Sequence, residues 1–373
     1  MFVIWNKKTI ERLSDVEKQQ WFDVLNYRLE EDRGISLDDP ELIIKQKEIK
    51  DDYIKYLESC PKQDNFFKYY VLYDNHKMVS VCRINIYNQR YLLEGLQTHR
   101  DQFRNGYATQ LIDGMIYDLK KEGIDTLYSE ARVWNVASNQ LQLQLGFTKY
   151  GEDKYNNLYQ LNIDSYIRRQ LFNRWSTQYH KSVSESESKG TYPFAGYSQV
   201  KYHLIELITK HQKKAILDMG VGTGEIMLPL YRLGYHITGV DLSENMLKIA
   251  KNSMPDALFI QGEFEDAIPQ LKQKYDVIVF SYAIHHLTYK KQIDLLTQLN
   301  SLLNQDGFIL IADVSGENPQ EMNALKERYE DIWDDEEFYP MNDIYQNSDL
   351  SHNYAILYVQ INEVAGIYKL NKK

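Results

Sequence analysis

Three glycines fall within five positions of the segment LDMGVGTGE, Leu217 to Glu225, directly after an apolar run. A glycine-rich turn between a strand and a helix lets a ligand approach the backbone closely, and dinucleotides and S-adenosylmethionine are two cofactors commonly held there. The dinucleotide fingerprint G-x-G-x-x-G requires its third glycine at position 225. This chain has Glu225 there, so the pattern conflicts with an NAD-dependent oxidoreductase.

Negative charge around the loop also distinguishes a dinucleotide from S-adenosylmethionine as its ligand. Asp218 and Glu225 would lie beside a pyrophosphate, an anion that helix N-termini otherwise favour. S-adenosylmethionine carries no phosphate, and its ammonium and sulfonium groups are positive. An acidic residue two places before the first glycine therefore predicts a site for this methyl donor.

Length and composition set broader limits. The chain has 373 residues and a formal net charge of -10, which predicts two domains and disfavours a broad nucleic-acid footprint. Cys60 and Cys82 form no metal or redox motif, so no metal site is expected. The N-terminal segment lacks the order of a signal peptide, and no long apolar segment follows. We therefore expect a cytoplasmic protein with no membrane association.

The first part of the chain mixes helix and strand signals. A short strand is expected at 2–5, and helical stretches at 15–29, 40–57, after the loop 99–108 to about 122, and from near 135. Further strands are expected at 68–74, 78–88, 91–98 and 125–133, with a closing hairpin at 146–163. These signals predict a mixed α+β sheet for residues 1–164.

The second part begins near Ser165 with an aromatic and basic stretch, followed by the polar run KSVSESESKG, 181–190, which is predicted to be a loop or mobile segment. Strand and helix signals then alternate, which predicts a Rossmann-like, doubly wound parallel sheet. The tail 354–370 is expected to add a hairpin at the sheet edge. The second domain is therefore predicted to span 165–373, with a cap at 165–200.

Four segments, DMGVGTG, VDLSENML, QGEF and YDVIVFSYAIHHL, follow one another in that order from position 218. They resemble the ordered motifs of the class I S-adenosylmethionine-dependent methyltransferases. Asp241 ends the second strand about twenty residues after the glycine loop, where a carboxylate can accept both ribose hydroxyl protons. The resemblance implies a donor site that comprises Asp218, Gly220, Gly222, Gly224, Asp241, Leu242, Met246, Glu263, Phe264 and Ser281.

Candidates for contact with the methyl acceptor come from the cap and from the segment after the fourth strand. Tyr179 and His286 are the predicted catalytic or acceptor-contacting residues, although aromatics that fill a cap core and a structural histidine pair remain open alternatives. Methyl transfer is an in-line displacement, so alignment and desolvation matter more than a strong base. The cap aromatics expected near the acceptor are Trp175, Tyr179, Tyr192, Phe194 and Tyr197.

Two segments of the first part, QFRNGYATQLI at 102–112 and NVASNQLQLQLGF at 135–147, resemble motifs of the GNAT acyl-CoA-dependent N-acyltransferases. Successive backbone amides at a helix N-terminus can cradle the pyrophosphate of CoA, and an arginine adds a charge-assisted contact. The spacing departs from the family pattern, because Arg104 lies two residues before Gly106 rather than three. The resemblance implies acetyl-CoA, or another acyl-CoA, bound by Arg104, Asn105, Gly106, Tyr107, Ala108 and Asn135.

Acetyl transfer itself depends on a proton donor and a base. Gln142 occupies the position where the family often has a tyrosine general acid, and glutamine cannot supply a proton. Glu94 is the candidate base, or an exposed strand acid. The sequence thus predicts a bifunctional methyl- and acetyltransferase that acts on a small molecule or a protein amine. The alternative is a methyltransferase whose first domain only binds acyl-CoA or a protein.

Overall fold

The computed structural model describes residues 1–24, 40–59, 62–210 and 214–373. The chain divides into two compact units, Met1–Ile167 and Arg168–Lys373. The boundary predicted at 164/165 lies inside one helix, α7 (Ile163–Trp175), which begins in the first unit and ends in the second. Every helix of the described ranges is too short or too polar to cross a bilayer.

The first unit is built on a seven-stranded sheet, as far as the structure describes it. Neighbouring strands are antiparallel except for one parallel pair, β4 with β5. The sheet order is β1-β2-β3-β4-β5-β7-β6, and the strands are β1 (Phe2–Trp5), β2 (Phe66–Asp74), β3 (Lys77–Tyr87), β4 (Arg90–Thr98), β5 (Thr126–Arg132), β6 (Thr148–Glu152) and β7 (Asn156–Asn162).

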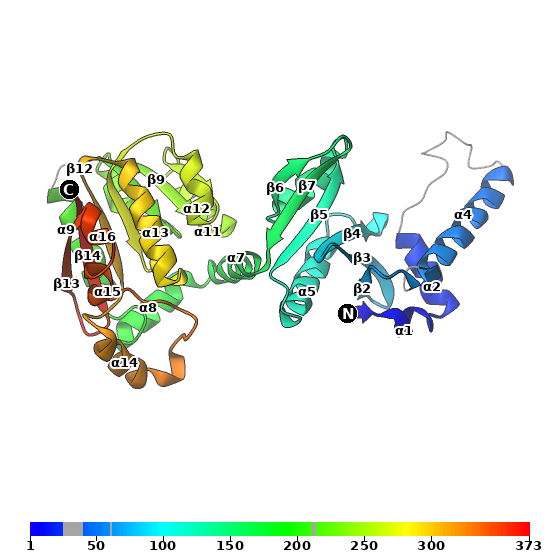
Figure 1. Ribbon diagram of the computed structural model, residues 1–373, viewed down its shortest axis with the longest axis horizontal. Helices are drawn as coiled ribbons and strands as arrows, with labels where there is room; N and C mark the ends of the chain where they lie inside the picture. The colour runs from blue at the N-terminus through cyan, green and yellow to red at the C-terminus, as the bar shows by residue number, and fades with distance from the viewer. Residues whose placement is uncertain (25–39, 60–61, 211–213) are drawn as a thin grey trace. The chain divides into compact units, whose positions relative to one another are not determined.

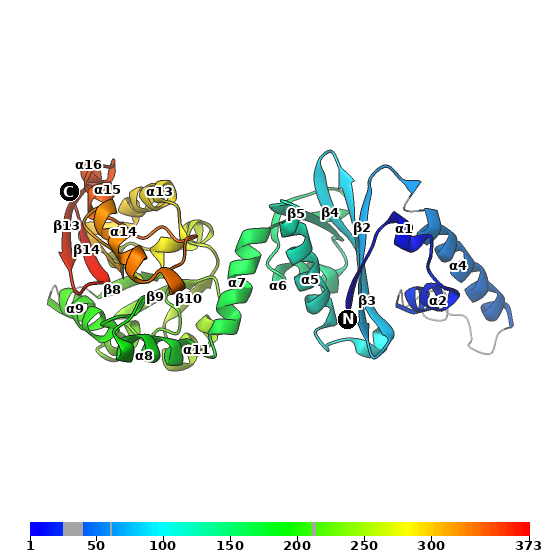
Figure 2. The ribbon, with the colours of Figure 1, turned by 90° about the horizontal axis from the view of Figure 1, so that it is seen from below.

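Alternation along β2 divides its side chains between two cores, because successive strand residues point to opposite faces. Tyr70 and Leu72 join the core under α5, whereas Tyr69 and Val71 join the core under α2. Figure 2 shows α5 and α6 on one side of this sheet and α1, α2 and α4 on the other. The helices are α1 (Lys7–Ile10), α2 (Asp15–Val24), α4 (Pro40–Ser59), α5 (Tyr107–Lys121), α6 (Val136–Gln144) and the 3-10 turn η2 (Arg100–Gln102).

The second unit has a seven-stranded sheet in the described chain, in the order β10-β9-β8-β11-β12-β14-β13. The first five strands are parallel, and the C-terminal hairpin adds the antiparallel pair β14 and β13. This arrangement confirms the predicted doubly wound sheet and its edge hairpin. The strands are β8 (Ala215–Met219), β9 (His236–Asp241), β10 (Leu258–Gln261), β11 (Tyr275–Ser281), β12 (Leu303–Val314), β13 (Tyr354–Gln360) and β14 (Ala365–Lys372).

Helices cover both faces of this sheet, as Figure 1 and Figure 2 show. One core packs α9 to α11 against the sheet, and the other packs α13, α15 and α16. The helices are α8 (Tyr179–Lys189), α9 (Tyr197–Lys210), α10 (Met227–Arg232), α11 (Glu244–Ser253), α12 (Phe264–Ala267), α13 (Tyr289–Leu299), α14 (Pro319–Arg328), α15 (Asn342–Gln346) and α16 (Leu350–Asn353). Short 3-10 turns are η3 (Ile268–Gln270), η4 (Ile284–His286), η5 (Asn300–Leu302) and η6 (Glu330–Ile332).

The prediction of a loop at 181–190 is wrong, because most of this run lies in α8. Val183 is buried in the core of the second unit, and Gly190 ends the helix in the left-handed region with φ 61°. The serines and glutamates face outward or bond locally, as Ser186 does to the carbonyl of Thr191. Tertiary packing of one small apolar face therefore outweighs a composition typical of a loop.

Candidate functional site

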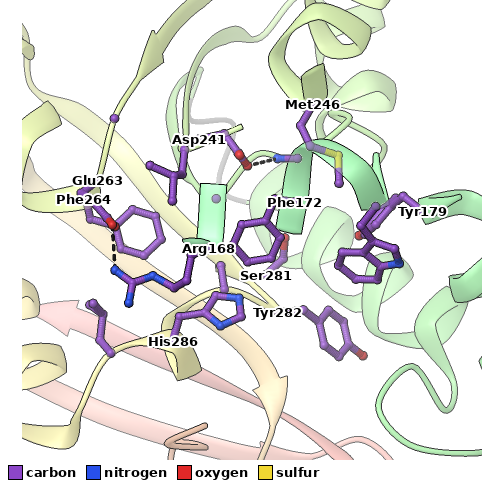
Figure 3. Close-up of a pocket in the computed structure, with 17 residues that line it drawn as sticks. Arg168, Phe172, Tyr179, Asp241, Met246, Glu263, Phe264, Ser281, Tyr282 and His286 are labelled. Carbon is purple, nitrogen blue, oxygen red and sulfur yellow. Dashed lines mark hydrogen bonds and ion pairs between the residues drawn. The ribbon is translucent and has the colours of Figure 1, made fainter. Parts of the chain in front are cut away.

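The strand order of the second unit reverses at β8, because the chain first proceeds outward through β9 and β10 and then returns to β11 on the other side. Ligands of such sheets bind at the carboxyl ends of the strands where this reversal occurs. A pocket of about 730 Å³, counted out to open solvent, lies at this edge. The predicted residues that line it are Tyr179, Gly220, Gly222, Asp241, Leu242, Met246, Glu263, Phe264, Ser281 and His286 (Figure 3).

The glycine loop turns sharply between β8 and α10. Gly220 has φ 91°, and a Cβ on it would lie 2.4 Å from the Cβ of Ala283. Gly222 borders the pocket, and a Cβ there would have no heavy atom within 4 Å. Gly224 packs against Met254 instead and is not among the lining residues. The three glycines thus serve two purposes, close packing behind the loop and an open backbone in front of it.

Asp241 ends β9 with both carboxylate oxygens engaged by the backbone. Its Oδ2 accepts from the amide of Gly222 and its Oδ1 from the amide of Ser243, each at 2.8 Å. Burial nevertheless raises the pKa of Asp241 to about 6. These bonds orient the carboxylate at the pocket wall, where each oxygen retains a lone pair for a ligand hydroxyl.

Asp218 lies behind the loop and does not line the pocket. Its side chain is fully buried, and within the described residues its Oδ1 has no hydrogen-bond partner. Burial, together with the negative charge of Asp241, raises the pKa of Asp218 to about 8. A buried carboxyl group without a donor is costly unless a cation compensates it, so this chemistry fits the positively charged part of S-adenosylmethionine.

The opposite end of the pocket is formed after β10. Glu263, predicted near the adenine amino group, accepts from the guanidinium of Arg168 at 2.8 Å. Phe264 packs edge-on against Phe280, and Met246 contributes its side chain from α11 (Figure 3). Leu242 and Ser281 complete this wall at the ends of β9 and β11. The predicted donor residues other than Asp218 and Gly224 are therefore brought together at one cavity.

One face of α7 supplies three lining residues, of which only Trp175 was predicted from the sequence, as a cap aromatic near the acceptor. Arg168, Phe172 and Trp175 are spaced i, i+4 and i+7, and all three line the pocket. This spacing could have identified the three residues from the sequence as a group, because such positions share one helical face. Asn173 ties the same helix to the start of α11, since its Oδ1 accepts from the hydroxyl of Ser243 at 2.7 Å. The other unassigned lining residues are Gly262, Tyr282, Ala283 and Leu287.

The two candidate acceptor-contacting residues both lie in the pocket wall. Tyr179 packs edge-on against Trp175, with ring centroids 5.0 Å apart, and burial raises the pKa of its hydroxyl. His286 lies 5.1 Å from the ring of Phe172, and its Nδ1 is 2.8 Å from Glu337. Burial and the charge of His285 lower the pKa of His286.

The predicted cap cluster separates into two groups. Trp175 and Tyr179 border the pocket, whereas Tyr192, Phe194 and Tyr197 are buried and are not among its lining residues. Tyr192 stacks on Trp333 with ring centroids 5.0 Å apart, in a different core. Only part of the cluster is therefore positioned to contact a ligand.

Glu225, which occupies the place of the third dinucleotide glycine, bonds to the cap. Its Oε1 accepts from Lys201 on α9 at 3.0 Å, and its Oε2 lies 3.2 Å from His180 on α8. The acidic residue thus links the glycine loop to two cap helices.

In the first unit, the loop 102–108 leads into the N-terminus of α5. Gly106 caps the helix in the left-handed region with φ 76°, and Asn105 donates to Gln102 at 3.2 Å. Within the described residues, the backbone amides from Arg104 to Thr109 donate to no protein acceptor. The side chain of Tyr107 is engaged elsewhere, by Asp74 at 2.8 Å. Such a run of amides, which includes Ala108, suits an anion.

The parallel ladder between β4 and β5 joins only Tyr91–Leu93 to Leu127–Ser129. Glu94, the candidate base, follows at once, and its Oε2 accepts from Arg83 at 2.9 Å and from Asn85 at 2.8 Å. Glu130 on β5 was not singled out from the sequence. Partial desolvation and the charges of Asp153 and Glu94 raise the pKa of Glu130. The charge of Glu94 thus acts on the carboxyl group of Glu130.

Gln142 and Asn135 have structural partners in the first unit. Gln142 is buried on α6, and its Nε2 donates to Ser129 at 2.7 Å. Asn135 caps the same helix, because its Oδ1 accepts from the amide of Ser138 at 3.0 Å. The Oδ1 of Asn135 is thus used on helix backbone, whereas the buried Oε1 of Gln142 has no hydrogen-bond partner among the described residues. The proposed ligand contacts of both residues stay predictions.

Two family models match separate parts of the chain. A methyltransferase domain matches residues 216–307, and the acetyltransferase (GNAT) family matches residues 29–147. The chain is 34% identical to an uncharacterized methyltransferase of Alkaliphilus oremlandii over 161 residues, 43% of this chain and 74% of that protein. It is 27% identical to an uncharacterized methyltransferase of Oceanobacillus iheyensis over 209 residues, 54% of this chain and 96% of that protein.

Solved structures of both kinds resemble parts of the chain. Magnesium protoporphyrin IX methyltransferase from Synechocystis PCC 6803, with bound SAH, has a TM-score of 0.43 at 16% identity and covers 56% of this chain and all of its own. The ribosomal-protein-S18-alanine N-acetyltransferase from Escherichia coli has a TM-score of 0.29 at 17% identity. It covers 44% of this chain and 94% of its own.

Proposed function

On the premise that this chain belongs to the methyltransferase family and carries a GNAT-family domain before its methyltransferase domain, we propose that it methylates a small-molecule acceptor with S-adenosylmethionine. The pocket at the ends of β8, β9 and β11 would hold the donor. A protein amine is the alternative acceptor. The surplus of acidic residues, with a net charge of -10, disfavours a nucleic acid.

Two carboxylates, one at the pocket wall and one buried behind the loop, carry this proposal. Asp241 is fixed by two backbone amides and presents its edge to the pocket, whereas Asp218 lies deeper with an oxygen that has no partner in the described chain. A ligand that offers hydroxyl groups and a positive charge satisfies both. A dinucleotide would instead bring two phosphate charges toward two carboxylates, which Coulomb repulsion opposes in a buried site.

The bound donor would supply a methyl group that its sulfonium makes electrophilic. The protein has to align an acceptor atom with that group and exclude water. Phe172, Trp175 and Tyr179 form an apolar, aromatic wall that can do both (Figure 3). Tyr179 and His286 are the side chains that we assign to contact with the acceptor, because both line the pocket and carry polar atoms.

A matched pair of glycine variants tests the donor site. Gly222 and Gly234 both have positive φ, 52° and 83°, and both have open space where a Cβ would lie, but only Gly222 lines the pocket. By isothermal titration with S-adenosylmethionine, Gly222→Leu should lose binding while Gly234→Leu retains it. Equal affinities for the two variants, with both folded, would refute the site. Formation of S-adenosylhomocysteine with a panel of small amines, alcohols and thiols then tests the transfer.

A second candidate function, acetyl transfer by the first unit, is favoured by the run of unbonded amides from Arg104 to Thr109. Acetyl-CoA would supply an activated thioester. The loop would bind its pyrophosphate through the backbone and Arg104, and the short ladder between β4 and β5 leaves the backbone after Leu93 available to an extended ligand. Glu94 and Glu130 are the candidate bases. Gln142 would act on the leaving thiolate only as a hydrogen-bond donor, a role that requires no proton transfer from its side chain. The competing proposal is a non-catalytic acyl-CoA-binding or interaction module.

A further inference from the structure

Two adjacent histidines and a distant glutamate meet beside the donor pocket. His285 and His286 lie on η4, directly after β11, and their ring centroids are 4.1 Å apart. Glu337 comes from the segment between η6 and α15. One potential ligand atom from each of the three residues lies within 4.8 Å of the other two. Their side chains are only 13%, 23% and 16% exposed, respectively, so the cluster is built into the protein rather than dispersed on its surface.

A further carboxylate orients the first histidine. The Nδ1 of His285 lies 2.7 and 2.9 Å from the two oxygens of Asp313, which is fully buried at the end of β12. Histidines that ligate metals commonly donate the other ring nitrogen to a carboxylate, which fixes the ring and the tautomer. This arrangement leaves the Nε2 of His285 as its metal-binding atom. The Nδ1 of His286 lies 2.8 Å from the Oε1 of Glu337, a separation that two atoms bound to the same ion can also have.

The charge and the donor atoms select a class of ion. Asp313 and Glu337 bring two negative charges to two imidazole rings, and Asp334 adds its negative charge near His285. Two imidazole nitrogens and one carboxylate oxygen are ligands for zinc and its neighbours in the first transition row, whereas magnesium and calcium prefer oxygen alone. Zinc bonds such ligands at about 2.0–2.2 Å, so two atoms on one ion lie at most about 4.4 Å apart, close to the limit of 4.8 Å within which the three candidate ligand atoms lie.

We propose that His285, His286 and Glu337 bind one divalent transition-metal ion, zinc in the first place. Three protein ligands leave a coordination position open, as in catalytic zinc sites. His286 also lines the donor pocket, so the open position adjoins the space for the methyl acceptor. An oxygen, nitrogen or sulfur atom of the acceptor would be bound there as a metal ligand. The metal site does not depend on the proposed methyl transfer, because its ligands are separate from the carboxylates assigned to the donor.

The test is a titration of the full-length protein, treated with EDTA and then freed of it, with zinc chloride. We expect one saturable site, and with cobalt(II) as the probe a visible d–d absorption that reports nitrogen and oxygen ligands. Glu337→Gln and His286→Gln should each weaken zinc binding by about tenfold or more. His352→Gln is the matched control, because His352 is an exposed histidine 3.6 Å from the carboxylate of Asp349, and it should bind zinc as the wild type does.

One further measurement separates loss of the metal site from loss of the fold. Glu337→Gln should still bind S-adenosylmethionine in EDTA, which shows that the variant is folded and separates the metal site from the donor site. Absence of a saturable site in the wild type overturns the proposal. So does equal weakening in His352→Gln, or unchanged zinc affinity in both cluster variants.

Discussion

The glycine loop after β8 and the loop before α5 both present backbone amides at the start of a helix, but they differ in what lies behind those amides. Beside the first loop are two carboxylates, Asp218, which is buried, and Asp241, which lines the pocket and accepts from the amide of Gly222. In the second loop, the described amides from Arg104 to Thr109 have no acceptor. The comparison shows that a backbone turn alone does not define its ligand. In the first loop an amide already bonds the carboxylate of Asp241, so this loop suits a cationic ligand. The second loop suits an anionic ligand, because its described amides have no acceptor.

The same contrast holds for the candidate reactive side chains. In the second unit Tyr179 and His286 line a defined pocket. In the first unit Gln142 is buried against Ser129, and Asn135 caps a helix. The pocket proposed for the methyl donor thus combines a glycine loop with nearby polar side chains in one cavity. In the first unit, the side chains of Gln142 and Asn135 make bonds within the protein instead.

The largest expected effect is that of Asp241→Ala on S-adenosylmethionine binding. The carboxylate of Asp241 would bond two ribose hydroxyls, and its loss would remove two charge-assisted hydrogen bonds of about 1.5–3 kcal/mol each, so affinity should fall at least about 100-fold. Isothermal titration measures this, and acetyl-CoA affinity should not change. Asp256→Ala is the control, since Asp256 bonds only Tyr231 among the described residues; a loss of affinity that it shared would contradict the assignment.

A smaller effect is expected for Gly106→Glu on acetyl-CoA binding. The new carboxylate would repel the pyrophosphate at the start of α5, so affinity should fall by about tenfold while S-adenosylmethionine binding is unchanged. Gly123→Glu is matched in backbone, with φ 74° against 76° and open space at both Cβ positions, and should behave as the wild type. If the wild type fails to bind acetyl-CoA, the first unit is an interaction module.

The pH dependence of donor binding should follow the two carboxylates. Because a cationic ligand favours ionised Asp218, whose pKa is raised to about 8, affinity should rise with pH and level off near pH 8. Below that pH the slope should approach about tenfold per unit, and it should steepen below pH 6 as Asp241 is protonated. Titrations from pH 5.5 to 9 measure this profile.

The raised pKa of Asp218 also predicts that Asp218→Asn changes the thermal stability of the ligand-free protein. The folded pKa of Asp218 lies above its usual value of 3.8, so its contribution to stability is complete below about pH 4 and is lost as pH rises to 8. The asparagine variant should therefore have a higher Tm than the ligand-free wild type at pH 8. It should bind the donor more weakly and without the inflection near pH 8. A wild-type Tm that rose with pH across this range, relative to the variant, would contradict the assignment.

The smallest effect is expected for Glu225→Gln. Its bonds to Lys201 and His180 join partly exposed side chains, and such pairs contribute about 0–1 kcal/mol. The Tm should fall by no more than about 4 °C, and donor affinity by less than about fivefold. Lys201→Met should give a similar shift in thermal unfolding. A much larger loss of donor affinity would mean that Glu225 contacts the donor itself.

Most of the residues that the sequence patterns assigned to the methyl donor line one pocket, where strand ends and chain order coincide. Asp241 and Ser281 end parallel strands and Glu263 follows one, and the carboxyl ends of such strands meet at one edge. The patterns failed where tertiary packing decides. The helix α8 depends on Val183, a single buried side chain in a polar run, although Gly190 at its end was a readable stop signal.

Other parts of the site depend on distant segments. Glu337 reaches His286 from 51 residues along the chain, and nothing in the spacing predicts that contact. Arg168, Phe172 and Trp175 had helical spacing, yet an amphipathic helix has many possible neighbours. The spacing identifies a face, and only the fold shows which cavity that face closes.

The bonds of Asn173 have a kinetic consequence. This residue bonds α7 to Ser243 at the start of α11, beside the carboxylate that would hold the donor ribose. Its neighbours on the last turn of α7, Phe172 and Trp175, form part of the aromatic wall. Because α7 borders both the proposed donor site and the aromatic wall of the acceptor site, we expect the two substrates to bind in a fixed order. Methyl donor should enter first and its demethylated product should leave last, as in a compulsory-order mechanism.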